Sequence, residues 1–257
     1  MHDNLHIEDE IKKVINQLKP LSLADLDAVS LLDRQDSKYT FNIKFLPEFL
    51  KAAKNDYKVL EIENRRIFKY DSLYFDTDDY LLYKYHHNEK VNRLKIRYRK
   101  YVESNLTFFE VKYSLYGTRT SKKRLKQEDI KTELSAVEFN KIENVVFDKT
   151  TLKSKLWVYY SRITLVNNAM TERVTLDINL KYKNENGNEV LMKNLAIAEI
   201  KQNKRSVLMP FIQMMKQKRI PPLSISKYCM GVALTEPTIK SNNFKPKFIT
   251  LKKIMNA

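Results

Sequence analysis

Glycine, cysteine and histidine are scarce in this sequence, and each scarcity excludes a class of site. The 3 glycines are far apart, at Gly117, Gly187 and Gly231, so the chain cannot build the glycine-rich phosphate loops of P-loop or Rossmann proteins. The single cysteine, Cys229, excludes an internal disulfide and any cysteine-based zinc or iron–sulfur site. The 4 histidines show no metal-triad spacing. A metal ion, if one binds, must therefore be held by oxygen atoms.

Long apolar runs are also missing. No stretch approaches the roughly 18 apolar residues of a transmembrane helix. The N-terminus MHDNLHIEDEIKK is polar and mixed in charge, unlike a secretory signal. Hydrophobic residues make up 43% of the chain and charged residues 30%. We therefore expect a soluble, folded protein, and the lone cysteine favours a cytoplasmic location.

Positive charge is in large excess. The sequence has 47 lysines and arginines against 31 aspartates and glutamates, a net charge of +16. A surplus of this size implies a polyanionic partner, which composition alone leaves open among nucleic acid, a phosphorylated small molecule, inorganic polyphosphate and an acidic membrane. The basic C-terminal stretch FKPKFITLKKIMNA could contact a membrane or a membrane partner, or form a loosely packed tail.

The pattern of apolar residues predicts an α+β protein with one main domain. Runs rich in Val, Ile, Tyr, Phe and Thr, bounded by turn residues, predict strands at 36–41, 57–62, 66–76, 91–101, 106–115, 118–127, 155–167, 171–182 and 190–203. Helical spacing predicts helices at 9–18, 45–50, 78–85, 127–145, 206–217 and, behind a serine cap, 226–235. So many strands joined by short turns indicate an antiparallel sheet that is curved or closed, with helices outside.

Several predicted strands have one charged face. Residues two apart in a strand share a face, so Arg93, Lys95, Arg97 and Arg99 form one basic row opposite Leu94, Ile96 and Tyr98. The same alternation places charged residues together on further strands, among them Glu110 with Lys112, Lys122 with Arg124, and Glu199 with Lys201. Each strand alone is explained by a solvated outer face.

Taken together, the charged faces favour an interior lumen. Cations about 7 Å apart along a strand repel one another by up to about 2 kcal/mol per pair at an effective dielectric constant of about 20, unless an anion lies between them. If the apolar faces pack outward under helices, the charged faces line a site suited to a chain of phosphates. The acidic residues Glu110, Asp177 and Glu199 could there hold Mg²⁺ or Mn²⁺.

An ordered series of motifs resembles the VTC-type polyphosphate polymerase domain, a branch of the triphosphate tunnel metalloenzymes. These motifs are Arg34-Gln-Asp36-Ser-Lys38-Tyr39, Ser72-Leu-Tyr74-Phe75-Asp76-Thr77, Lys95-Ile-Arg97-Tyr-Arg99-Lys-Tyr101, Phe109-Glu110-Val-Lys112, Tyr160-Ser161-Arg162, Glu172-Arg173-Val-Thr175-Leu-Asp177, Glu199-Ile-Lys201 and Ser226-Lys227-Tyr228. Each motif is weak alone, but eight in the family's order make a specific match. The resemblance implies a lead-in at 1–29, a tunnel domain at 30–236 and a basic tail at 237–257.

The resemblance also implies a fold and a set of site residues. The fold would be a closed antiparallel β-barrel, the triphosphate tunnel, with a basic interior. The catalytic phosphate ligands would be Lys38, Arg97, Arg99, Lys112, Arg162, Arg173 and Lys227. Further phosphate contacts would come from Lys122 or Lys123, Tyr160 and Ser226. The charged faces add Arg93, Lys95, Arg124 and Lys201 as candidates for phosphate binding, of which Arg93 and Lys95 could instead lie at the tunnel mouth and capture anions electrostatically. Glu199 matches the family's metal-binding glutamate, with Glu110 and Asp177 as further candidates.

This sequence departs from the family's pattern in two ways. Asp36 stands where many relatives carry Glu, and the regulatory SPX domain and membrane helices of the eukaryotic complex are absent from the sequence. The second departure leaves no sequence basis for moving a product across a membrane.

Three functions follow as hypotheses. The leading one is a Mn²⁺- or Mg²⁺-dependent polymerase that transfers the γ-phosphoryl group of ATP, or of another triphosphate, to inorganic polyphosphate. The second is a metal-dependent triphosphatase or polyphosphatase, with water as the acceptor. The third is a noncatalytic polyphosphate or nucleic-acid binding module. Acids interleaved with the cations argue against simple polyanion capture, so we expect no nucleic-acid partner.

Overall fold

The computed structural model describes residues 2–28, 35–114, 121–143, 145–202 and 209–257. Its main element is an 11-stranded, largely antiparallel sheet in the order β2-β11-β9-β8-β4-β5-β6-β7, with β1, β3 and β10 attached at the side. The strands are β1 (Lys19–Leu21), β2 (Gln35–Asn42), β3 (Tyr57–Leu60), β4 (Phe68–Asp76), β5 (Arg93–Tyr101), β6 (Leu106–Ser114), β7 (Ser121–Gln127), β8 (Lys153–Asn167), β9 (Glu172–Asn184), β10 (Glu189–Leu191) and β11 (Leu195–Gln202). The parallel pairing is that of β1 with β3.

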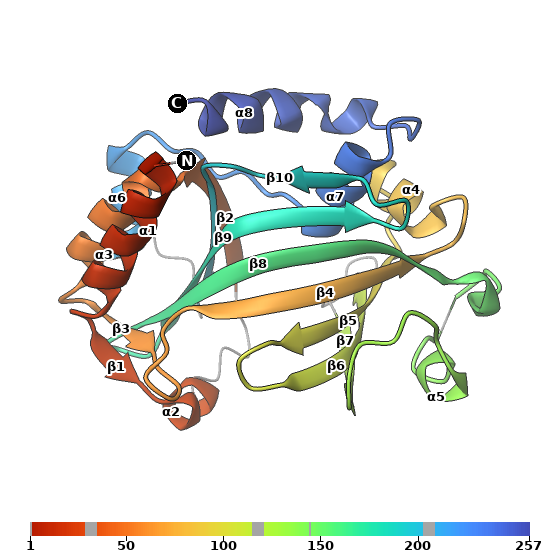
Figure 1. Ribbon diagram of the computed structural model, residues 1–257, viewed down its shortest axis with the longest axis horizontal. Helices are drawn as coiled ribbons and strands as arrows, with labels where there is room; N and C mark the ends of the chain where they lie inside the picture. Colours follow the sequence, from red (N-terminus) through yellow and green to blue (C-terminus); the bar gives the residue numbers. More distant parts are fainter. Residues whose placement is uncertain (1, 29–34, 115–120, 144, 203–208) are drawn as a thin grey trace.

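Helices cover the sheet from several sides (Figure 1). They are α1 (His2–Ile15), α2 (Leu23–Ala28), α3 (Leu46–Ala53), α4 (Leu81–His87), α5 (Ala136–Phe139), α6 (Pro210–Gln217), α7 (Lys227–Thr235) and α8 (Lys245–Met255). Figure 1 shows α1, α3 and α6 together at one end of the sheet, and α8 along one edge above β10. None of the helices in the described ranges is long and apolar enough to cross a bilayer.

The apolar strand faces pack outward, as the alternation predicts. Leu94, Ile96 and Tyr98 of β5 are buried on the convex side of the sheet, under residues of the segments 130–143 and 145–152. At the other end, Ala198 and Ile200 of β11 belong to the core formed with α1, α3 and α6. Burying apolar surface on the convex side leaves the charged alternate residues on the inner side, which we call the concave face.

Helix α7 closes one end of the concave face. Its N-cap is Ser226, whose hydroxyl accepts a hydrogen bond from the backbone N–H of Cys229. A Cβ atom at Gly231 would lie 2.5 Å from side-chain atoms of both Leu156 and Tyr182, so the glycine lets the helix lie directly on β8 and β9. The cap and the glycine together bring Lys227, the first helical residue, to the charged part of the concave face.

The predicted closure of the barrel is not confirmed. In the part of the chain that the structure describes, β2 pairs with β11 and β7 pairs with β6, and no backbone pairing joins β2 to β7. The sheet curves so that its two ends approach through side chains, and lysines from β2, β5 and β6 line one cavity. Like charges facing one another oppose closer approach of the two ends.

Two other predicted elements differ in the structure. Among the described residues of the helix expected at 127–145, the single turn α5 is helical; it begins at the capping box of Ser135 and Glu138 and stays short because the flanking chain covers the convex face irregularly. The strand expected at 190–203 is split by Asn194, whose φ of 60° turns the chain between β10 and β11. The strand β1 was not predicted. Residues 115, 118–120, 144, 203 and 206–208, which belong to five predicted elements, lie outside the described residues.

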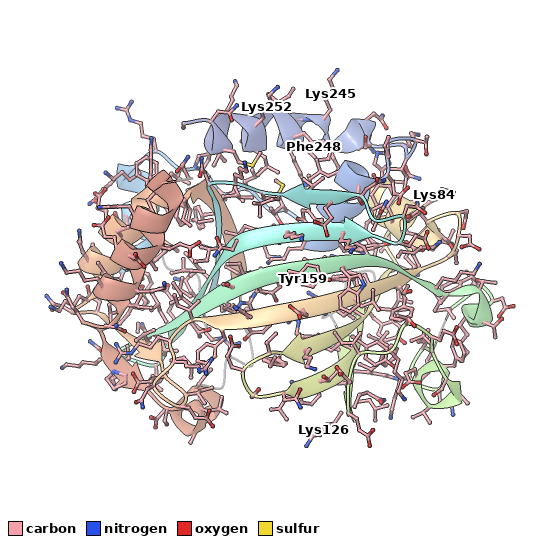
Figure 2. All side chains as sticks on the ribbon, viewed as in Figure 1. Lys84, Lys126, Tyr159, Lys245, Phe248 and Lys252 are labelled. Atoms are coloured by element: carbon pink, nitrogen blue, oxygen red, sulfur yellow. The ribbon has the colours of Figure 1, made fainter. Side chains whose placement is uncertain are left out.

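The C-terminal tail is a packed helix. In α8, Leu251 is buried, and Phe248, Ile254 and Met255 pack against the core beneath the helix. The carbonyl groups of Ile254 and Met255 accept hydrogen bonds from Asn42 and Asn194 at 2.9 and 3.1 Å. Figure 2 shows Lys245 and Lys252 pointing away from the sheet.

Candidate functional site: the concave face and its two cavities

Strand register places the charged residues of the concave face in rows. Arg97, Glu110 and Arg124 lie directly opposite one another on β5, β6 and β7. A neighbouring row on the same three strands consists of Lys95, Lys112 and Lys122. On the other half of the sheet, one row consists of Thr164, Thr175, Glu199 and Lys38. The neighbouring row consists of Arg173, Lys201 and Asp36. Opposite charges across neighbouring strands attract, whereas a row of lysines is unfavourable without an anion.

Glu110 is the acidic centre of one cluster. Its carboxylate accepts hydrogen bonds from Nε and Nη2 of Arg97 at 2.9 and 2.6 Å and pairs with Lys122. Arg99 and Arg124 lie 4.0 and 3.9 Å away. Although burial by itself raises the pKa of this carboxyl, the charges of Arg97, Arg99 and Lys122 hold the pKa below its usual value. Glu110 therefore remains an anion and fixes the arginines.

Asp177 is the centre of a second cluster. Arg162 donates two hydrogen bonds to it, at 2.6 and 2.8 Å, and Lys227 donates a third at 2.5 Å. Burial alone raises the pKa of Asp177, but Arg162 and Lys227 outweigh this effect and lower it. The Asp177 side chain is only 2% exposed, so it positions Arg162 and Lys227 from within the wall.

Tyrosines orient the arginines further. Arg97 donates to the Tyr74 hydroxyl at 2.7 Å. Arg162 lies over the rings of Tyr70 and Tyr160, at 5.1 and 5.3 Å from their centroids, and these two rings stack on each other. Cation–π contacts and carboxylate pairing together fix the guanidinium groups before any ligand binds.

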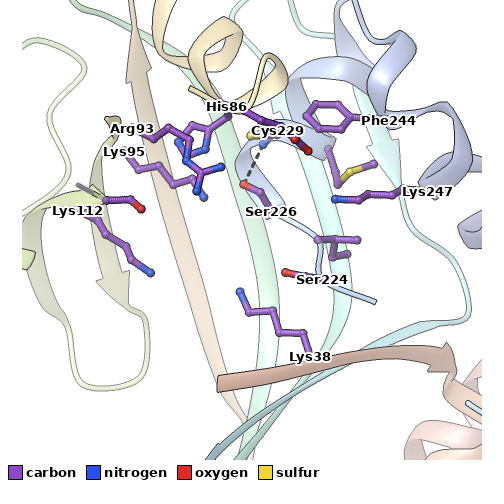
Figure 3. A pocket seen from close by; sticks show the side chains of 14 residues that line it. Lys38, His86, Arg93, Lys95, Lys112, Ser224, Ser226, Cys229, Phe244 and Lys247 are labelled. Carbon is purple, nitrogen blue, oxygen red and sulfur yellow. Dashed lines mark hydrogen bonds between the residues drawn. The ribbon is translucent and has the colours of Figure 1, made fainter. Parts of the chain in front are cut away.

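Cations converge in a first cavity, of about 260 Å³, which we call the lysine cavity. It is lined by Lys38 of β2, Arg93 and Lys95 of β5, Lys112 of β6, Lys247 of α8 and Ser226 at the start of α7 (Figure 3). Within the described ranges, none of these five cations has a carboxylate within ion-pair distance, although Glu89 also lines the cavity. Arg93 Nε is buried with no hydrogen-bond partner among the described residues.

The electrostatics of the lysine cavity reflect this crowding. Desolvation, together with the like charges of Lys95 and Lys38, lowers the pKa of Lys112 to about 8. Burial and the neighbouring charges of Lys38 and Arg97 also lower the pKa of Lys95. Burial, reinforced by Lys95, lowers the pKa of His86 to about 3, so this ring is neutral at pH 7. An anion bound here would relieve the repulsion, which makes the cavity a candidate phosphate site.

A second cavity, of about 590 Å³, lies at the other end of the concave face. We call it the aromatic cavity because Phe68, Tyr70, Tyr101 and Phe108 line it. Its cationic lining consists of Arg65, Lys122, Arg124, Arg162, Arg173 and Lys201. Leu23, Leu26, Leu60 and Ile62 add an apolar wall. This cavity therefore combines charged, aromatic and aliphatic surfaces, and it has more apolar lining residues than the lysine cavity, where Ile225, Met230 and Phe244 are apolar.

Glu199 is the carboxylate best suited to a divalent ion. Lys201 lies 2.8 Å from it, and no other described cation lies within ion-pair distance. Burial raises its pKa, but Lys201 and Lys38 hold the pKa below the usual value, so the group is an anion. The described residues contain no cluster of three or more metal-ligating side chains. Mg²⁺ commonly binds one or two carboxylates together with substrate phosphates, and Glu199 fits this mode.

The structure brings most of the predicted site residues to the concave face, with one clear exception. Lys123 projects from the other face of β7, where it pairs with Glu143. Of the two predicted alternatives, Lys122 and Lys123, it is Lys122 whose side chain reaches the interior. Ser226 lines the lysine cavity and also caps α7. Arg34 of the first motif lies outside the described residues.

Sequence reasoning missed several residues of these cavities. Tyr70 lies two positions from Ser72 and four from Tyr74 in one strand, so the alternation that placed the arginines could also have placed Tyr70. Lys247 had no comparable signal, because its position depends on how α8 packs against the sheet. His86 and Phe108 were likewise not predicted as lining residues.

Comparison with known families gives one match, to the model of the VTC domain, over residues 33–236. A comparison with curated proteins gives no sequence match.

Solved structures with a related arrangement are distant in sequence. A Hippeastrum protein, described as a candidate adenylyl cyclase with a dominant triphosphatase activity, is 12% identical with a TM-score of 0.48, over 77% of this chain and 94% of that chain. A candidate adenylate cyclase from Vibrio parahaemolyticus is 13% identical with a TM-score of 0.45, over 76% and 97% of the two chains. The Pct1 RNA triphosphatase of S. pombe is 10% identical with a TM-score of 0.30, over 90% and 85%.

Proposed function

Since the chain belongs to the VTC domain family, we propose that it is a polyphosphate polymerase. It would transfer the γ-phosphoryl group of ATP, or of another triphosphate, to the end of an inorganic polyphosphate chain on the concave face. The observation that carries this proposal is the lysine cavity, where five cations without carboxylate partners in the described residues lie beside the paired arginines.

The two kinds of cation support two tasks. Arg97 and Arg162 are fixed by carboxylates and tyrosines, so they can hold phosphate oxygens in a defined geometry. Lys38, Lys95 and Lys112 act as point charges that attract the anionic chain and offset the charge on the transferring group. Arg99, Arg173 and Lys227 would add further phosphate contacts.

The reaction needs few covalent contributions from the protein. A terminal oxygen of the polyphosphate chain would attack the γ-phosphorus, the bond to the β–γ bridging oxygen would break, and ADP would leave. The acceptor is already an anion, so no side chain need remove a proton from it. The protein's part is to align the two anions and to stabilise the transition state electrostatically.

A divalent cation fits this arrangement at Glu199, with substrate phosphates as the remaining ligands. Bound Mg²⁺ or Mn²⁺ would neutralise charge on the phosphates. Lys201 orients the Glu199 carboxylate from 2.8 Å, and Lys38 lies directly opposite it on β2. Glu110 and Asp177, the other two predicted metal ligands, are already engaged by arginines and lysines.

The hydrogen bonds that Glu110 and Asp177 accept from arginines also bear on the triphosphatase alternative. A triphosphatase needs a carboxylate near the metal to orient the attacking water. The two carboxylates proposed for this role, Glu110 and Asp177, each accept hydrogen bonds from an arginine. This favours transfer to a phosphate chain over transfer to water.

Incubating the purified protein with ATP and Mn²⁺, then separating the products on a gel, tests the proposal. We expect ADP together with a phosphate polymer. Orthophosphate without polymer would replace the polymerase with a triphosphatase.

The Glu199→Gln variant tests the noncatalytic alternative with the same assay and with inorganic tripolyphosphate binding. We expect turnover to fall by about a hundredfold or more, because a neutral amide cannot replace the carboxylate toward a metal ion. Metal-free tripolyphosphate binding should persist. Binding without turnover in the wild type would instead indicate a binding module. Asp9→Asn, at a surface carboxylate far from the sheet interior, is the matched control.

A further inference from the structure

The aromatic cavity has features that a phosphate chain does not require. Leu60, Ile62 and Phe68 form an apolar wall next to Tyr101 and Phe108. Apolar and aromatic surface gives a phosphate group no favourable contact, whereas the faces of a nucleobase gain from it. Its volume of about 590 Å³ lies within the usual ~300–1,000 Å³ of small-molecule sites, whereas the lysine cavity, at about 260 Å³, falls below that range.

Arg124 connects this apolar wall with the phosphate-binding row. Its guanidinium carbon lies 3.3 Å from the ring centroid of Phe108, which is direct stacking contact, and Nη2 donates to the Tyr101 hydroxyl at 3.3 Å. Its Nε lies 3.9 Å from Glu110, the centre of the Arg97 cluster. The aromatic residues thus hold the guanidinium against the Phe108 ring, at the β7 end of the row formed by Arg124, Glu110 and Arg97.

A flat guanidinium backed by an aromatic ring is a platform on which a base can stack. The Arg124 side chain is 42% exposed, so its outer surface is open to a ligand in the cavity. A base on this platform would have its phosphates directed along the row toward Arg97. Arg162 lines the same cavity, and Lys95, two residues before Arg97 on β5, lines the lysine cavity.

We propose that the aromatic cavity binds the nucleoside part of the triphosphate donor, with Arg124, supported by Phe108 and Tyr101, as the stacking platform. This inference rests on the proposed function and adds a direction to it. The nucleotide enters from the aromatic cavity, and the polyphosphate chain occupies the lysine cavity.

The Phe108→Leu variant distinguishes the contribution of the nucleoside to binding from that of the phosphates. Leucine keeps apolar bulk but removes the ring that supports Arg124. Dissociation constants for ATP and for inorganic tripolyphosphate, measured by calorimetry without metal, give the two readouts. We expect ATP binding to weaken about tenfold, as the loss of a stacking contact does, while tripolyphosphate binding changes less than twofold.

Arg124→Lys is a second variant, since it keeps the positive charge and removes the planar guanidinium group. It should give the same selective loss for ATP. The matched control is Phe45→Leu, which alters another phenylalanine in contact with lysine side chains, at 5.3 and 5.5 Å, outside both cavities. This control should leave the affinities for both ligands unchanged.

The outcomes separate this inference from the proposed function. Two results would overturn the nucleoside site while leaving the polymerase proposal in place. One is an equal loss of affinity for ATP and for tripolyphosphate, and the other is that neither variant loses affinity for either ligand. Failure of the wild-type protein to bind either ligand would overturn both.

Discussion

Two regions of the concave face, the carboxylate clusters and the lysine cavity, present their cations differently. Around Glu110 and Asp177, arginines are paired with buried carboxylates at 2.6–2.9 Å, so each of these clusters contains an anion before any ligand arrives. In the lysine cavity, the described residues supply no such partner to Lys38, Lys95, Lys112, Arg93 or Lys247. Pairing with a buried carboxylate fixes the geometry of an arginine, whereas crowded cations without such a partner oppose folding and attract an anion.

This difference has a consequence for how the protein binds its ligand. The paired arginines can reorient little, because three or more contacts hold each carboxylate cluster. The unpaired lysines gain most from a bound phosphate, since an anion relieves their mutual repulsion. The lysine cavity should therefore govern affinity, and the arginine clusters should govern alignment.

Removing the carboxylate from one of the two clusters should produce the largest effect on stability. Asp177→Ala leaves Arg162 and Lys227 without their buried partner, and we expect the free energy of unfolding to fall by about 3–5 kcal/mol. Urea denaturation measures this change. Asp9→Ala, at a carboxylate that is 77% exposed in a surface pair, should change it by less than about 0.5 kcal/mol. A small change in Asp177→Ala would mean that Arg162 and Lys227 do not depend on this carboxylate.

Removing one positive charge from the lysine cavity should change the unfolding free energy in the opposite direction. In Lys95→Met, one of the crowded charges is replaced by an apolar chain of similar length, and we expect the unfolding free energy to rise by about 1 kcal/mol. Tripolyphosphate binding should weaken about tenfold to a hundredfold, because a charged contact is lost. A variant that is both less stable and unchanged in binding would contradict the distinction between the two regions.

The smallest effect concerns pH. The pKa of Lys112 is lowered to about 8, so its cation is present below that pH and lost as pH rises through it. At pH 9 about a tenth of this side chain stays protonated. We expect the tripolyphosphate dissociation constant to rise a few-fold between pH 7 and 9. Lys112→Arg should flatten this profile, since arginine stays charged. An equally steep profile in Lys112→Arg would assign the titration to another group.

The sequence was informative where a short-range period determines the structure. Arg97 and Arg99 share a face because side chains alternate along a strand, whatever the rest of the fold does. The Ser226 cap of α7 is likewise a local signal, and the structure has it. These local rules placed the basic row and most strands near their observed positions.

The rest depends on relations between distant segments. That Glu110 pairs with Arg97 and Lys122 follows from strand register, which alternation does not specify. The failure of β2 and β7 to pair depends on the curvature of the whole sheet. Lys247 reaches the lysine cavity through the packing of a helix more than 130 residues away from Lys112 in sequence. Such contacts arise from tertiary packing and leave no local pattern.

Unfolding in the presence of inorganic tripolyphosphate tests most directly whether the lysine cavity is a preformed anion site. A ligand that binds only the folded state at a hundred times its dissociation constant should stabilise it by about 2.7 kcal/mol. We predict this gain for the wild type, and its reduction to about 0.4–1.4 kcal/mol in Lys95→Met at the same ligand concentration, because the dissociation constant is then about ten to a hundred times higher. A wild-type protein that gains no more from tripolyphosphate than from sodium chloride at equal ionic strength would contradict the account.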